Sequence, residues 1–215
     1  MPSLPSIAVV DYGAGNLRSV AKALERSDLQ PRVTDDPREV VAADGVVLPG
    51  VGAFRDAVAR LDETGLDSAL REVFSMGRPY LGLCLGLQLL FDESSEHGRT
   101  EGLGIFSGKV ERFPDTDPAG AQLRVPQIGW NEVRFEGVHP MLAGLPEKDY
   151  FYFVHSYRAI PEDSKQVLGF ADYGGDFAAA VGGENIFAVQ FHPEKSQAAG
   201  KRLLDAYRVW VESRR

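Results

Sequence analysis

The chain has 215 residues, 44% of them hydrophobic and 25% charged, a composition typical of one globular domain of the larger kind. Its formal net charge of −8, with no basic cluster, argues against a nucleic-acid partner, and no apolar run is long enough to span a membrane. The N-terminal residues lack the pattern of a signal peptide and a single cysteine permits no internal disulfide, so we expect a cytoplasmic protein.

In the first half of the chain, short apolar runs alternate with segments of helical periodicity. The expected strands are Ser6–Tyr12, Arg32–Thr34, Asp44–Pro49 and Pro79–Cys84. The expected helices are Leu17–Leu24, Phe54–Leu61, Leu66–Phe74 and Leu85–Phe91. Continuous apolar strands that alternate with helices are typical of a parallel sheet covered on both faces.

After about residue 104 the pattern changes to strands separated by Gly, Pro and Asp turn signals. The expected strands are Ile105–Phe113, Gln127–Phe135, Tyr150–Ala159, Val167–Tyr173, Phe177–Val181 and Ile186–Phe191. Tyr173–Asp176 is expected to be a hairpin turn, and Gln197–Val211 a closing helix. We therefore expect residues 1–215 to form a single α/β domain. Its central, mostly parallel sheet is flanked by helices, and additional antiparallel strands lie in the C-terminal half.

The only cysteine lies in the string Gly82-Leu83-Cys84-Leu85-Gly86, between a strand-like run and a helical segment. A Gly-x-Cys-x-Gly string at a strand-to-helix turn has the design of the Gly-x-Ser-x-Gly elbow of hydrolases, since flanking side chains would collide with neighbouring strands. A lone cysteine is more often a small buried hydrophobe than a nucleophile. The glycine frame favours a nucleophile, provided that the rest of the chain supplies a base.

The best candidate for that base is His192, which precedes Pro193 and Glu194. Residues i and i+2 of an extended segment point the same way, and the proline holds His192 extended, so Glu194 could orient the imidazole ring. Taken alone, the pair could be a solvated strand end. Together with the glycine-framed cysteine, it completes a set of nucleophile, base and orienting group.

An acyl-transfer site also needs backbone donors for the oxyanion. One candidate is the N–H of Leu85, directly after the cysteine. The second is expected in the loop that holds Val51 and Gly52, where glycines allow a peptide to rotate at low cost. No metal site is predicted, because the chain has one cysteine and no His-Glu-x-x-His motif, and no cofactor is expected.

These motifs resemble class I (triad) glutamine amidotransferases. Within that family, the chain is similar over its whole length to the glutaminase subunits of imidazole glycerol phosphate synthases, which act in histidine biosynthesis. The strings that carry this similarity are Asp11–Leu17, Pro49–Phe54, Ile128–Asn131, Tyr152–Tyr157 and Phe191–Ser196. One departure is Gln127, where members of the family often carry histidine.

The resemblance implies hydrolysis of L-glutamine to glutamate and ammonia, with Cys84 as nucleophile, His192 as proton shuttle and Glu194 as its orienting partner. It also implies a glutamine pocket lined by Gln88, Glu96, His155, Ser156 and Tyr157. The spacing supports Gln88 independently, because it lies one helical turn after Cys84 and thus on the same face.

The resemblance further implies a heterodimer, in which ammonia passes to a cyclase subunit with a (β/α)8 barrel. The chain itself has no phosphate-binding loop for the cyclase substrate. Asn16, Trp130 and Lys195 lie next to the active-site motifs in the sequence, and we place them at the docking face. Trp130 could equally be an ordinary core residue.

Three other functions remain open at this level. A glutaminase of another system, such as pyridoxal-phosphate synthase, would use the same triad, but the Asp11–Leu17 string argues against it. A cysteine peptidase or γ-glutamyl hydrolase would differ in its substrate, since it would not release ammonia from free glutamine. A non-catalytic binding module would be expected to have lost Cys84, His192 or Glu194, and all three are present.

Overall fold

The structure is a computed structural model that describes residues 3–215. Its helices are α1 (Leu17–Glu25), α2 (Pro37–Ala42), α3 (Phe54–Thr64), α4 (Leu66–Ser75), α5 (Leu85–Gln88) and α6 (Gln197–Glu212), with 3-10 turns η1 (Pro140–Leu142), η2 (Ser164–Gln166) and η3 (Pro193–Lys195). Its strands are β1 (Ser6–Val10), β2 (Gln30–Thr34), β3 (Gly45–Leu48), β4 (Tyr80–Leu83), β5 (Phe91–Ser94), β6 (Thr100–Glu101), β7 (Phe106–Arg112), β8 (Gln127–Phe135), β9 (Lys148–His155), β10 (Tyr157–Pro161), β11 (Val167–Asp172), β12 (Asp176–Gly182) and β13 (Ile186–Val189).

Within these residues, nine strands form one mixed sheet in the order β2-β1-β3-β4-β13-β12-β11-β8-β9. The pairings from β2 to β13 are parallel, and those from β13 to β9 are antiparallel. A second sheet of four strands has the order β10-β7-β5-β6. The expected α/β architecture, with antiparallel strands added by the C-terminal half, is confirmed.

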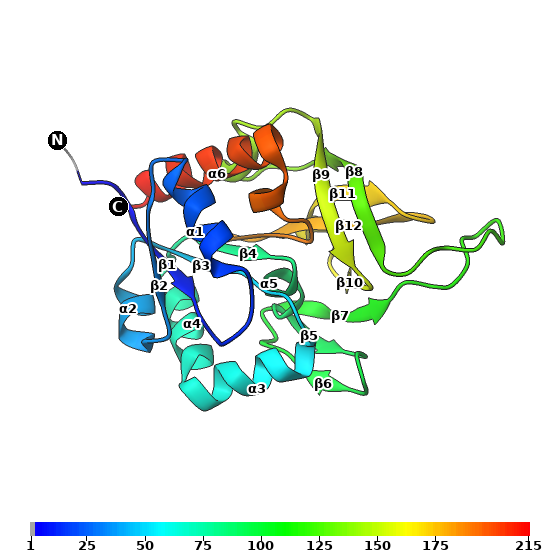
Figure 1. Ribbon diagram of the computed structural model, residues 1–215, viewed down its shortest axis with the longest axis horizontal. Coiled ribbons are helices and arrows are strands. Elements are labelled where there is room, and N and C mark those ends of the chain that lie inside the picture. Colours follow the sequence, from blue (N-terminus) through cyan, green and yellow to red (C-terminus); the bar gives the residue numbers. More distant parts are fainter. Residues whose placement is uncertain (1–2) are drawn as a thin grey trace.

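Helices cover both faces of the large sheet (Figure 1): α1 and α6 lie on one face, and α2, α3 and α4 lie on the other. The strands alternate accordingly. In β1, Ile7 and Val9 pack into the core under α1 and α6, whereas Ala8 and Val10 pack into the opposite core. Burial on both faces explains why the inner parallel strands β1, β3, β4 and β13 appear in the sequence as unbroken apolar runs, whereas the edge strand β2 is largely exposed and polar.

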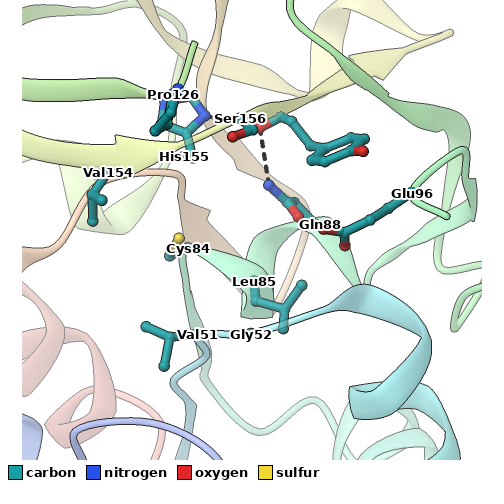
Figure 2. A pocket seen from close by; sticks show the side chains of 11 residues that line it. Val51, Gly52, Cys84, Leu85, Gln88, Glu96, Pro126, Val154, His155 and Ser156 are labelled. Carbon is teal, nitrogen blue, oxygen red and sulfur yellow. Dashed lines mark hydrogen bonds between the residues drawn. The ribbon is translucent and has the colours of Figure 1, made fainter.

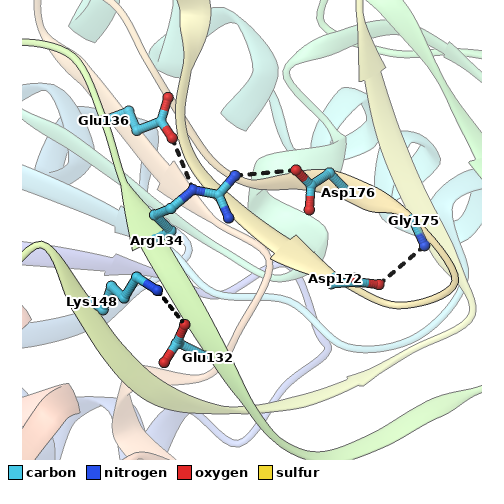
Figure 3. Close-up of polar contacts among 7 residues, drawn as sticks. All are labelled: Glu132, Arg134, Glu136, Lys148, Asp172, Gly175 and Asp176. Atoms are coloured by element: carbon cyan, nitrogen blue, oxygen red, sulfur yellow. Dashed lines mark hydrogen bonds and ion pairs between the residues drawn. The ribbon is translucent and has the colours of Figure 1, made fainter.

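Exposed ion pairs lie on the antiparallel half of the sheet, away from the parallel strands (Figure 3). Arg134 of β8 pairs with Glu136 at 2.9 Å and with Asp176 of β12 at 3.1 Å, and Lys148 of β9 pairs with Glu132 of β8 at 3.1 Å. Because these groups are solvated, each pair contributes little to stability. Only the Lys148–Glu132 pair joins neighbouring strands, because β11 lies between β8 and β12.

Two predicted elements are wrong. The helix expected over Leu85–Phe91 ends at Gln88, and Phe91 opens strand β5 instead. The strand expected over Tyr150–Ala159 breaks at Ser156, and its two parts belong to different sheets. Both errors have one cause, since an apolar run does not reveal where the chain changes direction to cross from the large sheet to the small one.

Helix α2 was not anticipated, although Asp36 caps its N-terminus and Pro37 is its first residue, a usual start signal. The hairpin turn at residues 173–176 is confirmed by the antiparallel pairing of Asp172 with Asp176.

None of the helices within residues 3–215 is long and apolar enough to cross a membrane.

Candidate active site

The residues expected to carry the chemistry follow three adjacent parallel strands. Strand β3 leads into the loop of Val51 and Gly52, β4 ends directly before Cys84, and β13 ends three residues before His192. Strand β4 pairs with β3 on one side and β13 on the other. Because the carboxyl ends of parallel strands meet at one edge of a sheet, this topology brings the three segments together.

Cys84 occupies a strained turn between β4 and α5. Its φ of 54° is rare for a residue with a side chain, and its backbone N–H donates to the Val189 carbonyl at 2.8 Å. The flanking glycines are required by contact: a Cβ on Gly82 would lie 2.6 Å from the Gly86 carbonyl oxygen, and one on Gly86 would lie 2.0 Å from the Leu48 carbonyl oxygen. The glycine frame thus has the steric role expected from the sequence.

His192 and Glu194 form a buried pair. Their Nδ1 and Oε1 atoms are 2.8 Å apart, and 4% and 5% of the two side chains are exposed. The expected pairing is confirmed, but the expected geometry is wrong. His192 is extended (φ −110°, ψ 94°), whereas Pro193 opens the 3-10 turn η3, and Glu194 reaches the imidazole from that turn rather than from a strand.

The charge of His192 is set by its neighbours. Burial acts to lower the pKa of the ring, but Cys84 and Glu194 outweigh burial and raise it to about 9. The other ring nitrogen, Nε2, makes no hydrogen bond of good geometry within residues 3–215, yet Cys84 lies close enough to favour the charged ring. At neutral pH the ring is therefore protonated and can donate a proton.

The backbone of His192 is clamped on both sides. Its N–H donates to the Tyr152 carbonyl at 3.0 Å, and its carbonyl accepts from the Ser196 hydroxyl at 2.6 Å. The Ser196 oxygen also accepts the N–H of Tyr152 at 3.0 Å. These three bonds fix the backbone of His192 relative to strand β9.

A cavity of about 350 Å³ opens beside Cys84, a size suited to a small metabolite. Figure 2 shows the cysteine between the Val51–Gly52 segment on one side and His155 on the other. The lining residues include every residue predicted for the glutamine pocket and for the oxyanion donors, namely Val51, Gly52, Leu85, Gln88, Glu96, His155, Ser156 and Tyr157. The described residues contain no group of side chains that could hold a metal ion.

One carboxylate and one amide side chain that line this cavity have defined hydrogen-bond partners. Glu96 accepts the backbone N–H of Phe54, at the start of α3, through Oε2 at 2.7 Å. The amide nitrogen of Gln88 donates to the Tyr157 carbonyl and to the Oε1 atom of Gln190, each at 3.0 Å. Gln190 was not singled out in the sequence, because a glutamine at a strand end carries no signal by itself.

His155 lies on the same wall and is neutral. Burial lowers its pKa to about 4. Its Nδ1 lies 2.8 Å from the Tyr157 carbonyl oxygen, which can only accept, so the single ring proton belongs on Nδ1. Its Nε2 must then accept, so the Gln127 side-chain atom 2.9 Å away, which is assigned as Oε1, is better read as the amide nitrogen.

The residues expected at a docking face lie outside the cavity. Trp130 is 48% exposed, which excludes a core role, and its ring meets Tyr152 edge-on at 6.3 Å between centroids. Lys195 places its ammonium 5.8 Å from the Tyr152 ring centre. Asn16 is exposed and caps helix α1 by accepting the Ser19 N–H at 3.3 Å.

The profile of the family described as "Glutamine amidotransferase class-I" matches residues 8–207, nearly the whole chain. This chain belongs to the class I glutamine amidotransferases. The elbow cysteine and the histidine–glutamate pair that suggested the family both lie within the matched residues. The protein is therefore an enzyme subunit of the glutamine amidotransferase type.

Curated relatives of this amidotransferase are named "Imidazole glycerol phosphate synthase subunit HisH". One from Methylococcus capsulatus is 50% identical over 212 residues, covering 96% of this chain and 97% of the relative. Another from Syntrophotalea carbinolica is 52% identical over 200 residues, covering 92% and 97%. The expected similarity to the glutaminase subunits of imidazole glycerol phosphate synthases is confirmed.

Solved structures support the amidotransferase fold at much lower identity. A chain of PurLQS from Thermotoga maritima superposes with a TM-score of 0.74 at 19% identity, covering 96% of this chain and 99% of that one. The glutaminase domain of CTPS from Trypanosoma brucei gives 0.68 at 16% identity, covering 98% and 95%. At such identity the likeness concerns the fold alone.

Proposed function

We propose that this protein hydrolyses L-glutamine through Cys84, His192 and Glu194 and delivers the ammonia to a cyclase subunit. The observation that carries the proposal is the buried His192–Glu194 pair, whose ring pKa is raised to about 9 beside the strained elbow cysteine. A protonated imidazole next to a sulfur nucleophile is the arrangement that acyl transfer needs. The relatives named as synthase subunits support glutamine as the substrate.

In the proposed reaction, the Cys84 thiolate attacks the side-chain amide carbon of glutamine. The C–N bond then breaks as His192 gives its proton to the leaving nitrogen, and ammonia departs. Water adds to the resulting thioester while His192 takes its proton, and the C–S bond breaks to release glutamate. Glu194 keeps the ring oriented and offsets its positive charge at both steps.

The proposed glutamine site is the 350 Å³ cavity. One oxygen of Glu96 is occupied by Phe54, which leaves Oε1 for the α-ammonium group of the substrate. Gln88 has its nitrogen committed to protein partners, so only its Oε1 is free to accept from the substrate. Ser156 and Tyr157 also line the cavity, and the family resemblance implies that they contact the substrate.

The proposed partner is a (β/α)8-barrel cyclase subunit that binds as the second half of a heterodimer. Trp130, Tyr152 and Lys195 form a cluster on the exposed side of strands β8 and β9, next to the clamp that holds His192. Ile128 adds an exposed apolar side chain to the same strand. Large exposed aromatic and apolar groups near a charged rim are typical of a protein interface.

We further propose that residues 1–215 act as one amidotransferase domain and that the reaction takes place in the cytoplasm. One core extends through nearly the whole chain, from β1 near its start to α6 near its end, and the other includes residues from β1 to β13. The proposed nucleophile Cys84 is a free cysteine, and the reducing cytoplasm keeps such a thiol reduced.

The oxyanion donors suggest a gate. In this conformation the Leu85 N–H is turned to the Gly50 carbonyl oxygen at 3.5 Å, a long and weak hydrogen bond. If the Gly50–Val51 peptide rotated, it would free Leu85 and could offer the Val51 N–H to the oxyanion as well. Glycine on each side of Val51 keeps such a rotation inexpensive. We propose that the docked cyclase and its ligand favour the rotated form.

The direct test of the glutaminase proposal uses Cys84→Ala and a glutamine-like electrophile. The wild type should release glutamate from glutamine and should be labelled once, at Cys84. The variant should lose both properties, because the chain has no other thiol that could form the thioester. Labelling at another residue, or glutamate release near the wild-type rate in the variant, would refute the proposed nucleophile.

A further inference from the structure

One buried side chain approaches the Cys84 sulfur within hydrogen-bonding range and has no role in the reaction described above. The side-chain nitrogen of Gln190 lies 3.5 Å from the Cys84 Sγ, within hydrogen-bonding range for sulfur. Gln190 is fully buried and lies two residues before His192 in the segment that follows β13. One short segment thus delivers both groups to the same sulfur atom, from the neighbouring parallel strand.

The neighbours of Gln190 fix which end of its amide faces the sulfur. The Tyr157 carbonyl can only accept, so the Gln88 atom 3.0 Å from it must be the nitrogen. That same nitrogen lies 3.0 Å from Gln190, so the Gln190 atom beside it must be the oxygen. The remaining end of Gln190, which points at Cys84, is therefore the NH2 group, a donor that cannot accept the thiol proton.

We propose that Gln190 is a further catalytic residue, whose amide donates a hydrogen bond to Cys84 Sγ and stabilises the thiolate. A donor favours the charged form of its acceptor, so this contact favours the anion over the thiol. The same bond would form again when the C–S bond of the thioester breaks and the sulfur leaves with its electron pair. This inference rests on the proposed glutaminase mechanism and adds a role to the same site.

Gln88 is then a positioning residue. It holds the Gln190 amide in the donating orientation, and its own free oxygen lines the glutamine cavity. A substrate N–H donated to that oxygen would polarise the two amides in series toward the sulfur. The Gln88–Gln190 pair therefore links occupation of the pocket to the nucleophile, a role that neither the glycine frame nor His192 supplies.

The test is the pH dependence of iodoacetamide alkylation, which reports only on Cys84 because the chain has one cysteine. Gln190→Met keeps the length of the side chain and removes the donor. The pH midpoint of its alkylation should rise by about one unit, because hydrogen bonds to charged groups are among the stronger ones. Below the midpoint, this shift corresponds to a roughly tenfold smaller thiolate fraction. Its kcat with the cyclase partner should fall about tenfold, with KM for glutamine little changed.

The matched control is Gln127→Met, which removes another buried amide, one that bonds His155 and has no hydrogen bond to the sulfur. Its midpoint should stay at the wild-type value. If Gln190→Met does not fold, Gln88→Met serves instead, and its midpoint should rise by a smaller amount. An unchanged midpoint in a folded Gln190→Met protein would overturn the inference. If that variant does not fold, an unchanged midpoint in Gln88→Met would overturn it instead. Alkylation requires neither glutamine nor partner, so failure of the glutaminase proposal would show separately, as a wild type without glutamate release.

Discussion

Substitution of Gly200 by alanine should disturb the active site from a position in α6 that never contacts the cavity. A Cβ at Gly200 would lie 1.8 Å from the carbonyl oxygen of Pro193 and 2.7 Å from its carbonyl carbon. Because the clashing atoms of Pro193 belong to the backbone, no change of rotamer relieves the clash. Helix α6 and turn η3 must therefore separate by more than about 1 Å. Turn η3 carries Glu194 and begins directly after His192, so the base and its orienting partner would move with it.

Two effects compete in the free energy of unfolding. Alanine favours a helix interior over glycine by about 1 kcal/mol, whereas overpacking of this severity costs about 3 kcal/mol. The net loss of about 2 kcal/mol should lower Tm by about 4 to 8 °C in a chain of this size. A displacement near 1 Å at the base should lower kcat about a hundredfold, with a smaller effect on KM.

The assay combines thermal unfolding with steady-state glutaminase kinetics in the presence of the cyclase partner. Gly144→Ala is the matched control, because a Cβ there meets no atom within 4 Å, and both Tm and kcat should stay at the wild-type values. A Gly200→Ala protein with a lowered Tm but an unchanged kcat would refute the claim that the seat of η3 on α6 positions the base.

The remaining predictions concern the triad, acid stability and the gate. His192→Ala should reduce kcat nearly as much as removal of the nucleophile, whereas Glu194→Gln should cost less, since it removes orientation and charge but leaves the proton shuttle; a silent Glu194→Gln would exclude that residue from the triad. Burial lowers the pKa of His139 and of His155 to about 4. As the pH falls from 6.5 to 4, these two histidines are therefore protonated in the unfolded chain but remain neutral in the folded chain. The free energy of unfolding from denaturant titrations should therefore fall over that pH range, and it should fall less steeply in His139→Gln. Equal slopes in the two proteins would contradict a lowered pKa for His139. His192, whose pKa is raised, acts in the opposite direction, and its contribution is full below pH 6.5 and is lost as the pH rises through 9. Finally, the isolated chain should hydrolyse glutamine on the order of a hundredfold more slowly than the complex with cyclase and cyclase ligand, and equal turnover in both states would rule out the gate.

The nucleophile elbow could be predicted from the sequence because its constraint is local. The glycines at 82 and 86 are required by backbone contacts at Cys84 itself, and Glu194 lies two residues from His192, so short strings carry both features. The inner parallel strands could be predicted equally well, because burial on both faces leaves unbroken apolar runs.

What the sequence did not reveal depends on contacts between distant segments. Gln190 acquires its role only from Cys84 and Gln88, which are 106 and 102 residues away in the chain. The orientation of Leu85 toward the Gly50 carbonyl is likewise a property of two loops brought together by the sheet. The break at Ser156 was missed because the residues on both sides have strand character and only the tertiary structure assigns them to different sheets.

The most direct test of the account follows the amide nitrogen of glutamine. The chain is mixed with the cyclase partner and the cyclase substrate, and the cyclase product is analysed after supply of amide-15N glutamine or of 15N ammonium. The account predicts co-elution of the two proteins and a labelled product from either source with the wild type, but from ammonium alone with Cys84→Ala. A product labelled from glutamine in Cys84→Ala, or no transfer of the glutamine label by the wild-type complex, would contradict it.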